Sequence, residues 1–496
     1  MRERLARSVF WLVWSRGLVQ GVSLLSTLLV ARMLSPTDYG LMALATIWTS
    51  TLALVAELGL GAAIIQFPDL EAMELNFCFW LSMALAGAGY LSLAAASPSI
   101  AAWFATPRLS EVLRVGGLTL PLVALRLVPE GLLRKRMQID KISQAEVVAV
   151  LLTLPVVLGM AWHGAGVWAL VVGALVLPLV QLLAVFRFVR WWPGVQMGSR
   201  RLGALIRYGF GSLGARASWA VYEQVDNFVL GRVAGGVVLG FYTMAKTLAI
   251  LPVVNITVVV NQVAMPVMAG LQADRSALRA SFLRGLRLVA CFTIPGCIGA
   301  ALIADDLVLI ALGAKWQPMV PLLRVLALFG LIRSLDALLP PILFARYRPA
   351  FLFWWTGALL LIMPFAYWIG AVQRGALGVA LALVVVYPII MVWMAHEAFK
   401  ELALDWKTVA HQLWPIMGAT LVMAAVVSAL HGAVPASDSL ARLGRLVLTV
   451  VSGALVYAVA ILRWNGSPAR EVADVIGWLF PRRPSLRSLP HRSVEA

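Results

Sequence analysis

The stretch from Leu213 to Pro252 places ionisable side chains inside two long apolar segments that meet at a glycine-rich corner. The first segment carries Arg216, Glu223 and Asp226, and the second carries Lys246. Ionisable groups in segments this apolar are costly unless they face a wet cavity or one another. The stretch therefore predicts a polar site inside an otherwise apolar protein.

Two acids of this stretch are candidates for ion coupling. Glu223 and Asp226 are three residues apart and share one face of a helix, with Asn227 beside them. A buried carboxylate needs a cation or a proton to offset its charge, so the pair is a candidate proton or sodium site. The alternative is a gate, in which these acids form salt bridges with Arg216, Arg232 or Lys246.

Six cationic residues are candidates for lining a cavity within the membrane. In order of preference they are Arg16, Arg216, Lys246, Arg126, Arg324 and Arg333. The first three lie deepest in the hairpins that begin each half of the chain. Each of the six could instead snorkel to the membrane surface or pair internally. Asp336 joins the candidate gate or coupling acids, and its position three residues after Arg333 favours a local ion pair with that arginine.

An internal echo relates the two halves of the chain. A shift of 200 positions aligns Arg32 with Arg232 and Gly40 with Gly240. Arg16 aligns with Arg216 in the same frame. Two related halves are the usual plan of a membrane transporter.

Composition identifies the broad class of protein. Of 496 residues, 61% are hydrophobic and only 13% are charged, and the mean hydropathy is +0.89. A soluble domain is nearer half apolar and a quarter charged, so we expect a polytopic membrane protein. The net charge of +17 fits basic cytoplasmic loops and gives no reason to expect nucleic acid as a partner.

Apolar runs of membrane-spanning length predict an all-α polytopic fold with about fourteen transmembrane helices. We expect two pseudo-symmetric six-helix lobes and a C-terminal helix pair. The predicted spans are 9–31, 41–65, 77–97, 111–133, 146–162 and 166–186 in the first lobe, 208–230, 239–262, 285–304, 319–343, 350–370 and 376–396 in the second, then 411–430 and 443–462.

The corresponding division of the chain gives five parts. They are an N-lobe at 1–186, a cytoplasmic linker at 187–207, a C-lobe at 208–398, a helix pair at 399–463 and a disordered cytoplasmic tail at 464–496. Most of the 40 Lys and Arg residues fall on one side of the membrane when the spans alternate. The positive-inside rule then places both termini in the cytoplasm.

Four segments, in order along the chain, resemble a known family. They are LLVARMLSPTDYGLMALATIW from Leu28, EGLLRKRMQI from Glu130, VDNFVLGRVAGGVVLGFYTMAKTLAILP from Val225 and LGAKWQPMVPLLRVLAL from Leu312. They resemble the Wzx-like polysaccharide flippases, in the colanic-acid and succinoglycan exporter branch of the multidrug/oligosaccharidyl-lipid/polysaccharide exporter superfamily. The resemblance covers about residues 8–400.

The resemblance implies a two-lobe fold around a central cavity in the bacterial inner membrane. It implies flipping of undecaprenyl-pyrophosphate-linked oligosaccharide by alternating access. Membrane lipids, and polysaccharide polymerase or chain-length machinery, are then the expected partners, and no cofactor is expected beyond a coupling proton or sodium ion. The cationic side chains suit such a substrate, because a guanidinium binds phosphate oxygens in pairs.

Two rival functions stay open. A drug/cation antiporter of the same superfamily would favour an acidic cavity, whereas the intramembrane charges here are mostly basic. An O-antigen ligase or polymerase would need a large outer loop with catalytic residues, and the largest predicted outer loop is only residues 305–318. The sequence contains no nucleophile–base motif or metal-ligand spacing, so we predict a transporter and not an enzyme.

Overall fold

The computed structural model describes residues 2–196, 202–272, 274–435 and 438–464. Within these ranges the side chains at 2–16, 212, 215, 255, 258–267 and 269 are not described. The described part is helical, and it contains no strand. Five residues of the predicted linker (197–201) and nearly all of the predicted tail (465–496) lie outside the described residues.

The helices follow one another with short connections. In chain order they are α1 (Arg2–Met33), α2 (Pro36–Glu57), α3 (Leu60–Gln66), α4 (Ala72–Trp103), α5 (Leu109–Gly116), α6 (Thr119–Lys135), α7 (Ile139–Trp162), α8 (Val167–Phe188), α9 (Leu202–Val233), α10 (Gly235–Gly270), α11 (Arg275–Leu302), α12 (Ala304–Ala311), the 3-10 helix η1 (Ala314–Met319), α13 (Val320–Asp336), α14 (Leu339–Ala345), α15 (Pro349–Leu402), α16 (Trp406–Ala433) and α17 (Ser439–Trp464).

This architecture confirms the predicted fold class. Three predicted spans are broken helices, namely α2–α3, α5–α6 and α13–α14, and two predicted spans are the halves of α15. The break in α15 lies at Arg374 and Gly375, and the φ of +57° at Gly375 favours glycine. The helix α9 begins at Leu202, inside the segment expected to be linker.

Ten helical segments of the described chain are long and apolar enough to span a membrane. The helices α9 and α13, which hold Asp226 and Arg333, are not among them. With 17 residues, α13 is shorter than the about 20 that cross the hydrocarbon, and α14 continues its path after a turn. Within its described side chains, α1 contributes the shorter apolar stretch Gly17–Met33.

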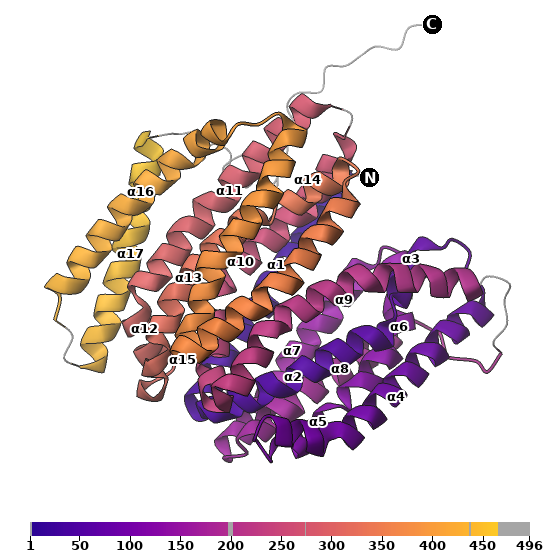
Figure 1. Ribbon diagram of the computed structural model, residues 1–496. Coiled ribbons are helices and arrows are strands. Elements are labelled where there is room, and N and C mark those ends of the chain that lie inside the picture. Colours follow the sequence, from indigo (N-terminus) through magenta and orange to yellow (C-terminus); the bar gives the residue numbers. More distant parts are fainter. Residues whose placement is uncertain (1, 197–201, 273, 436–437, 465–496) are drawn as a thin grey trace, which may run out of the picture.

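The helices form two bundles that meet at one end (Figure 1). One contains α2 to α8, with α1 packed against α7, and the other contains α10 to α15. The helix α9 lies along α2 and α3 and also packs against α15. The bundles meet most closely where α2 crosses α10.

The C-terminal pair α16 and α17 flanks the second bundle (Figure 1). Arg445 of α17 donates two hydrogen bonds, of 2.8 and 2.7 Å, to the carboxylate of Asp306 in α12. Asp306 is buried, and the guanidinium of Arg445 offsets its charge. This bidentate ion pair joins α17 to the second bundle.

Candidate functional site

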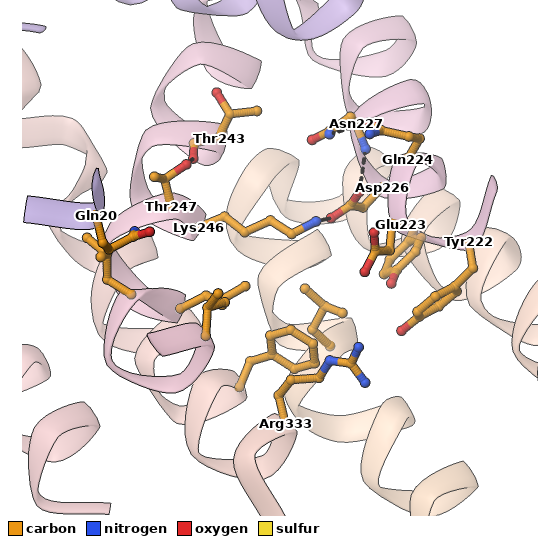
Figure 2. Close-up of a pocket in the computed structure, with 16 residues that line it drawn as sticks. Gln20, Tyr222, Glu223, Gln224, Asp226, Asn227, Thr243, Lys246, Thr247 and Arg333 are labelled. Carbon is orange, nitrogen blue, oxygen red and sulfur yellow. Dashed lines mark hydrogen bonds and ion pairs between the residues drawn. The ribbon is translucent and has the colours of Figure 1, made fainter. Parts of the chain in front are cut away.

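A cavity of 440 Å³, the polar chamber, lies between α9, α10, α13 and α15. Gln20 of α1 completes its wall. Figure 2 shows Lys246 of α10 and Arg333 of α13 both extending toward the residues of α9. The chamber therefore brings together charged residues from both arms of the predicted hairpin and from a helix farther along the chain.

Lys246 is held by a buried acid of the neighbouring helix. Its Nζ lies 2.5 Å from Oδ2 of Asp226, whose side chain is 2% exposed, whereas that of Lys246 is 24% exposed. The hydroxyl of Tyr242 donates to the same Oδ2 at 2.6 Å. This pairing is one of those that the gate alternative predicts, and it offsets the carboxylate charge within the protein.

Arg333 forms a second, similar group on the other side of the chamber. Its Nη1 lies 3.2 Å from Oδ2 of Asp336, as the three-residue spacing predicts. It also donates to the hydroxyl of Tyr387 at 3.1 Å, and Tyr387 in turn donates to Asp336. The guanidinium carbon lies 4.6 Å from the centre of the Trp219 ring, a cation–π contact. Three partners thus fix the orientation of this guanidinium.

The remaining polar groups of α9 also face the chamber. Glu223 is exposed and accepts a hydrogen bond of 3.0 Å from Nε1 of Trp219. Asn227 donates to Oε1 of Gln224 at 3.1 Å, and its own Oδ1 has no hydrogen-bond partner among the described residues. The chamber therefore offers a carboxylate and amide groups beside its two cations, a mixture suited to a charged and hydroxylated ligand.

A second cavity, the lateral cavity, adjoins the chamber and has a volume of 610 Å³. The two cavities share four wall residues, Glu223, Ile250, Val254 and Arg333. The rest of the lateral cavity is lined by α9, α10, α13, α14 and the first half of α15. Arg333 therefore lies between a cavity lined mostly by polar residues and one lined mostly by apolar residues.

The bundles are in close contact at the hairpin end, the end where the α1–α2 and α9–α10 turns lie. A Cβ added to Gly240 would overlap the carbonyl oxygen of Pro36, and one added to Gly40 would overlap that of Gly236. The two glycines that the sequence echo aligns thus lie at one helix crossing. Only glycine allows backbones this close.

The helix η1 adds a second contact at the hairpin end. Trp316 is fully buried and donates from Nε1 to the carbonyl oxygen of Ala31 at 2.9 Å, while Lys315 donates to that of Arg32 at 2.8 Å. These carbonyls belong to the last turn of α1 and need partners outside that helix. The Trp316 ring also packs edge-on against Tyr39 of α2, with the ring centres 5.4 Å apart.

Three other candidate cations lie away from the wall of the chamber. Arg216 forms a bidentate pair with Glu57 of α2, at 3.1 and 3.0 Å, and remains 46% exposed. Arg126 pairs with Glu130 at 2.9 Å and also donates to Gln181, and Arg324 pairs with Asp305. The backbone of Arg16 lies in α1, but its side chain lies outside the described residues.

Three residues that matter to the site are missing from the sequence prediction. Tyr242 precedes Lys246 by four residues, so helical spacing could have placed both on one face of α10. Trp219 lies four residues before Glu223 and could have been found in the same way. Tyr387 contacts residues 51 and 54 positions away, so no local spacing indicates it.

Comparisons with known proteins find relatives in polysaccharide biosynthesis. Residues 29–321 match the family described as "Polysaccharide biosynthesis protein". The chain is 25% identical to the teichuronic acid biosynthesis protein TuaB of Bacillus subtilis over 83% of this chain and 85% of that protein. It is also 25% identical to the succinoglycan biosynthesis transport protein ExoT of Rhizobium meliloti over 97% of both chains. These relatives confirm the resemblance carried by the four sequence segments.

Solved structures share the fold at low sequence identity. The lipid II flippase MurJ, in an inward closed conformation, superposes with a TM-score of 0.73 and 13% identity over 93% of this chain and 98% of that one. An inward-facing MATE-family multidrug transporter gives a TM-score of 0.60 and 16% identity over 77% and 95%. The fold is thus that of MurJ-like and MATE-like transporters.

Proposed function

Because the chain belongs to the polysaccharide biosynthesis protein family, we propose that it flips undecaprenyl-pyrophosphate-linked oligosaccharide across the bacterial inner membrane by alternating access. The names of its relatives support this substrate class, since one is a succinoglycan transport protein and another acts in teichuronic acid biosynthesis. The same proposal places both termini in the cytoplasm, following the distribution of Lys and Arg. The hairpin end is then periplasmic.

The observation that carries the proposal is the polar chamber with Lys246 and Arg333 on its wall. A lipid diphosphate cannot cross hydrocarbon without replacement of its hydration. Charge-assisted hydrogen bonds from an ammonium and a guanidinium supply that replacement. The contacts at the hairpin end correspond, in this orientation, to a periplasmic side that is closed.

The two ion pairs suggest how binding could be coupled to an ion. In the free protein Asp226 and Asp336 offset the two cations. A diphosphate that binds Lys246 or Arg333 in place of Asp226 or Asp336 leaves that carboxylate without its cationic partner in a low-dielectric site. That carboxylate would then take up a proton or a sodium ion, and its release on the other side would reset the pair.

Neutral substitutions test the proposal directly. Arg333→Gln and Lys246→Gln, alone and together, should reduce polymer export per molecule of protein in the membrane, measured in cells that lack the chromosomal gene. Arg324→Gln is the matched control, because Arg324 lies on the same helix but pairs with Asp305 away from the chamber. Normal export from the double variant would refute the proposal.

A drug/cation antiporter is the second candidate. The observation in its favour is that Glu223 and Asp226 line the chamber within a fold shared with MATE transporters. Such an antiporter would protect cells from cationic drugs, and protection would depend on Glu223 and Asp226 more than on Arg333. Drug-resistance assays run beside polymer-export assays on the same variants separate the two functions.

A further inference from the structure

The lateral cavity differs in chemistry from the polar chamber that it adjoins. Most of its lining residues are apolar, among them Leu352, Phe353 and Pro340. The hydroxyl groups of its lining residues donate hydrogen bonds to backbone carbonyls of their own helices. Ser218 donates to the carbonyl oxygen of Gly214 at 2.9 Å, and Thr356 donates to that of Leu352 at 2.9 Å. A ligand in this cavity would thus meet carbon and few free polar atoms.

The charged residues that line the lateral cavity either line the chamber as well or form an ion pair with a residue that does. They are Glu223, Arg333 and Asp336. Arg333 lines both spaces, and its guanidinium stacks on Trp219, which lines the lateral cavity. A ligand that fills both spaces should therefore have one anionic end beside Arg333 and one apolar part that extends away from it.

The far side of the lateral cavity presents aromatic side chains to the surroundings of the protein. Phe344 of α14 is 52% exposed and Phe353 of α15 is 64% exposed, and both line the cavity. Around a membrane-spanning helix, exposed apolar side chains face lipid. The cavity thus extends from the chamber toward the hydrocarbon, between α9 and the α14–α15 corner.

We infer that the lateral cavity binds the polyprenyl chain of the lipid-linked substrate, at the isoprene units nearest the diphosphate. The inference rests on the proposed function, since it assigns the tail of the same substrate. A molecule with a diphosphate in the chamber must lead its chain out to the membrane, and the lateral cavity is an apolar space that shares a wall with the chamber. Its 610 Å³ is within the about 300–1,000 Å³ of small-molecule sites.

Photo-crosslinking tests where the polyprenyl chain binds. The purified full-length protein in nanodiscs is irradiated with undecaprenyl diphosphate that carries a diazirine on the isoprene unit next to the phosphates. We expect adducts on Leu352, Phe353 or other residues of the lateral cavity, and unlabelled undecaprenyl diphosphate should suppress them. Adducts confined to other lipid-facing helices would overturn the inference, since the cavity would then hold no polyprenyl chain. Suppression of the adducts by phospholipid to the same extent would also overturn it, since the cavity would then hold an ordinary acyl chain.

A matched pair of substitutions tests the same point by affinity. Leu352→Trp fills the lateral cavity, whereas Leu361→Trp makes the same change at a position of α15 that is 66% exposed and does not line either cavity. Leu352→Trp should weaken binding of undecaprenyl diphosphate about tenfold, because chain methylenes lose apolar contacts, and Leu361→Trp should leave it unchanged.

Failure of the inference can be told apart from failure of the proposed function. If Lys246→Gln weakens binding while Leu352→Trp does not, the diphosphate site stands and the tail assignment is wrong. If the wild-type protein binds no undecaprenyl diphosphate, the proposed function itself fails. Should Leu352→Trp not fold, Ala337→Leu, a smaller change in the lining, takes its place in the same comparison.

Discussion

Two buried carboxylates organise the charges of the chamber at the scale of single residues. Asp226 and Asp336 are 2% and 1% exposed, and each has both a cation and a tyrosine hydroxyl as partners. Removing one member of such a buried pair costs more than removing both, because the remaining charge is left without compensation. Stability and transport should therefore respond differently to single and double substitutions.

The first prediction concerns the Asp226–Lys246 pair. Asp226→Ala should destabilise the protein by about 3 kcal/mol, the low end for a broken buried pair, since part of Lys246 is exposed to the chamber. The double variant Asp226→Ala with Lys246→Met should recover most of that stability but not transport. Thermal unfolding in nanodiscs measures the first effect and polymer export the second. Recovery of export by the double variant would show that this pair has only a structural role.

The second prediction separates a structural from a substrate-binding role for Arg216. Arg216→Glu should impair export, because two carboxylates then face each other where Arg216 and Glu57 now pair. If the pair only joins α9 to α2, exchanging the charges, with Arg216→Glu and Glu57→Arg together, should restore export. If Arg216 binds substrate, the exchange should fail. Export assays on the three variants decide between these roles.

Sequence spacing could indicate the local part of this site but not the distant part. The pairing of Arg333 with Asp336 follows from three residues of separation, and that of Asp226 with Lys246 follows from a hairpin. By contrast, the sequence places Arg216 among the cavity-lining cations, whereas the structure pairs it with Glu57. That pairing depends on how α9 lies along α2, which no local pattern specifies.

The crossing of α2 and α10 is the closest helix contact between the two bundles. Gly40 and Gly240 occupy corresponding positions of the two halves, and each lets the other helix's backbone approach. In lipid the hydrophobic effect does not drive helices together, and small residues at such crossings allow close van der Waals packing instead. Larger side chains there should hold the helices apart.

The third prediction follows from this crossing. Gly240→Ala should separate α2 from α10 at the hairpin end and increase labelling, from the periplasmic side, of a cysteine placed at Thr247 in the chamber. Gly236→Ala is the control, because a Cβ at Gly236 meets no atom within 4 Å. The labelling uses a membrane-impermeant maleimide. Equal labelling of the two variants would show that the crossing does not close this end.

The existence of the helices was easier to predict than their breaks. Apolar length alone predicts the two halves of α15, and the break at Arg374 and Gly375 falls between the predicted spans 350–370 and 376–396. The break within α2–α3 is absent from the prediction, since apolar residues continue through it. Leu58, with a φ of 45°, adopts its turn because it packs into a buried cluster that joins distant helices.

At the scale of the whole molecule, the contacts at the hairpin end join the two bundles. Trp316 is buried there, and it joins η1 to α1, α2 and α10 through one hydrogen bond and two ring contacts. A transporter that alternates its access must break these contacts in each cycle. Weakening them should favour the state that is open at the hairpin end.

The fourth prediction concerns the contacts of Trp316 at the hairpin end. Trp316→Ala should increase periplasmic labelling of the cysteine at Thr247 and should slow export, because the cycle then spends more time in the opened state. Trp414→Ala is the control, since Trp414 is 70% exposed on α16. The three native cysteines are buried and free, so they give little background. Unchanged labelling in Trp316→Ala would exclude a role for this residue in closing the hairpin end.

The most direct test of the central claim is a structure of the protein with undecaprenyl diphosphate bound. We predict phosphate oxygens within hydrogen-bond distance of Lys246 Nζ and of the Arg333 guanidinium, with the contact between Lys246 and Asp226 lengthened. A diphosphate located elsewhere, with both ion pairs intact and the chamber occupied only by water, would contradict the claim.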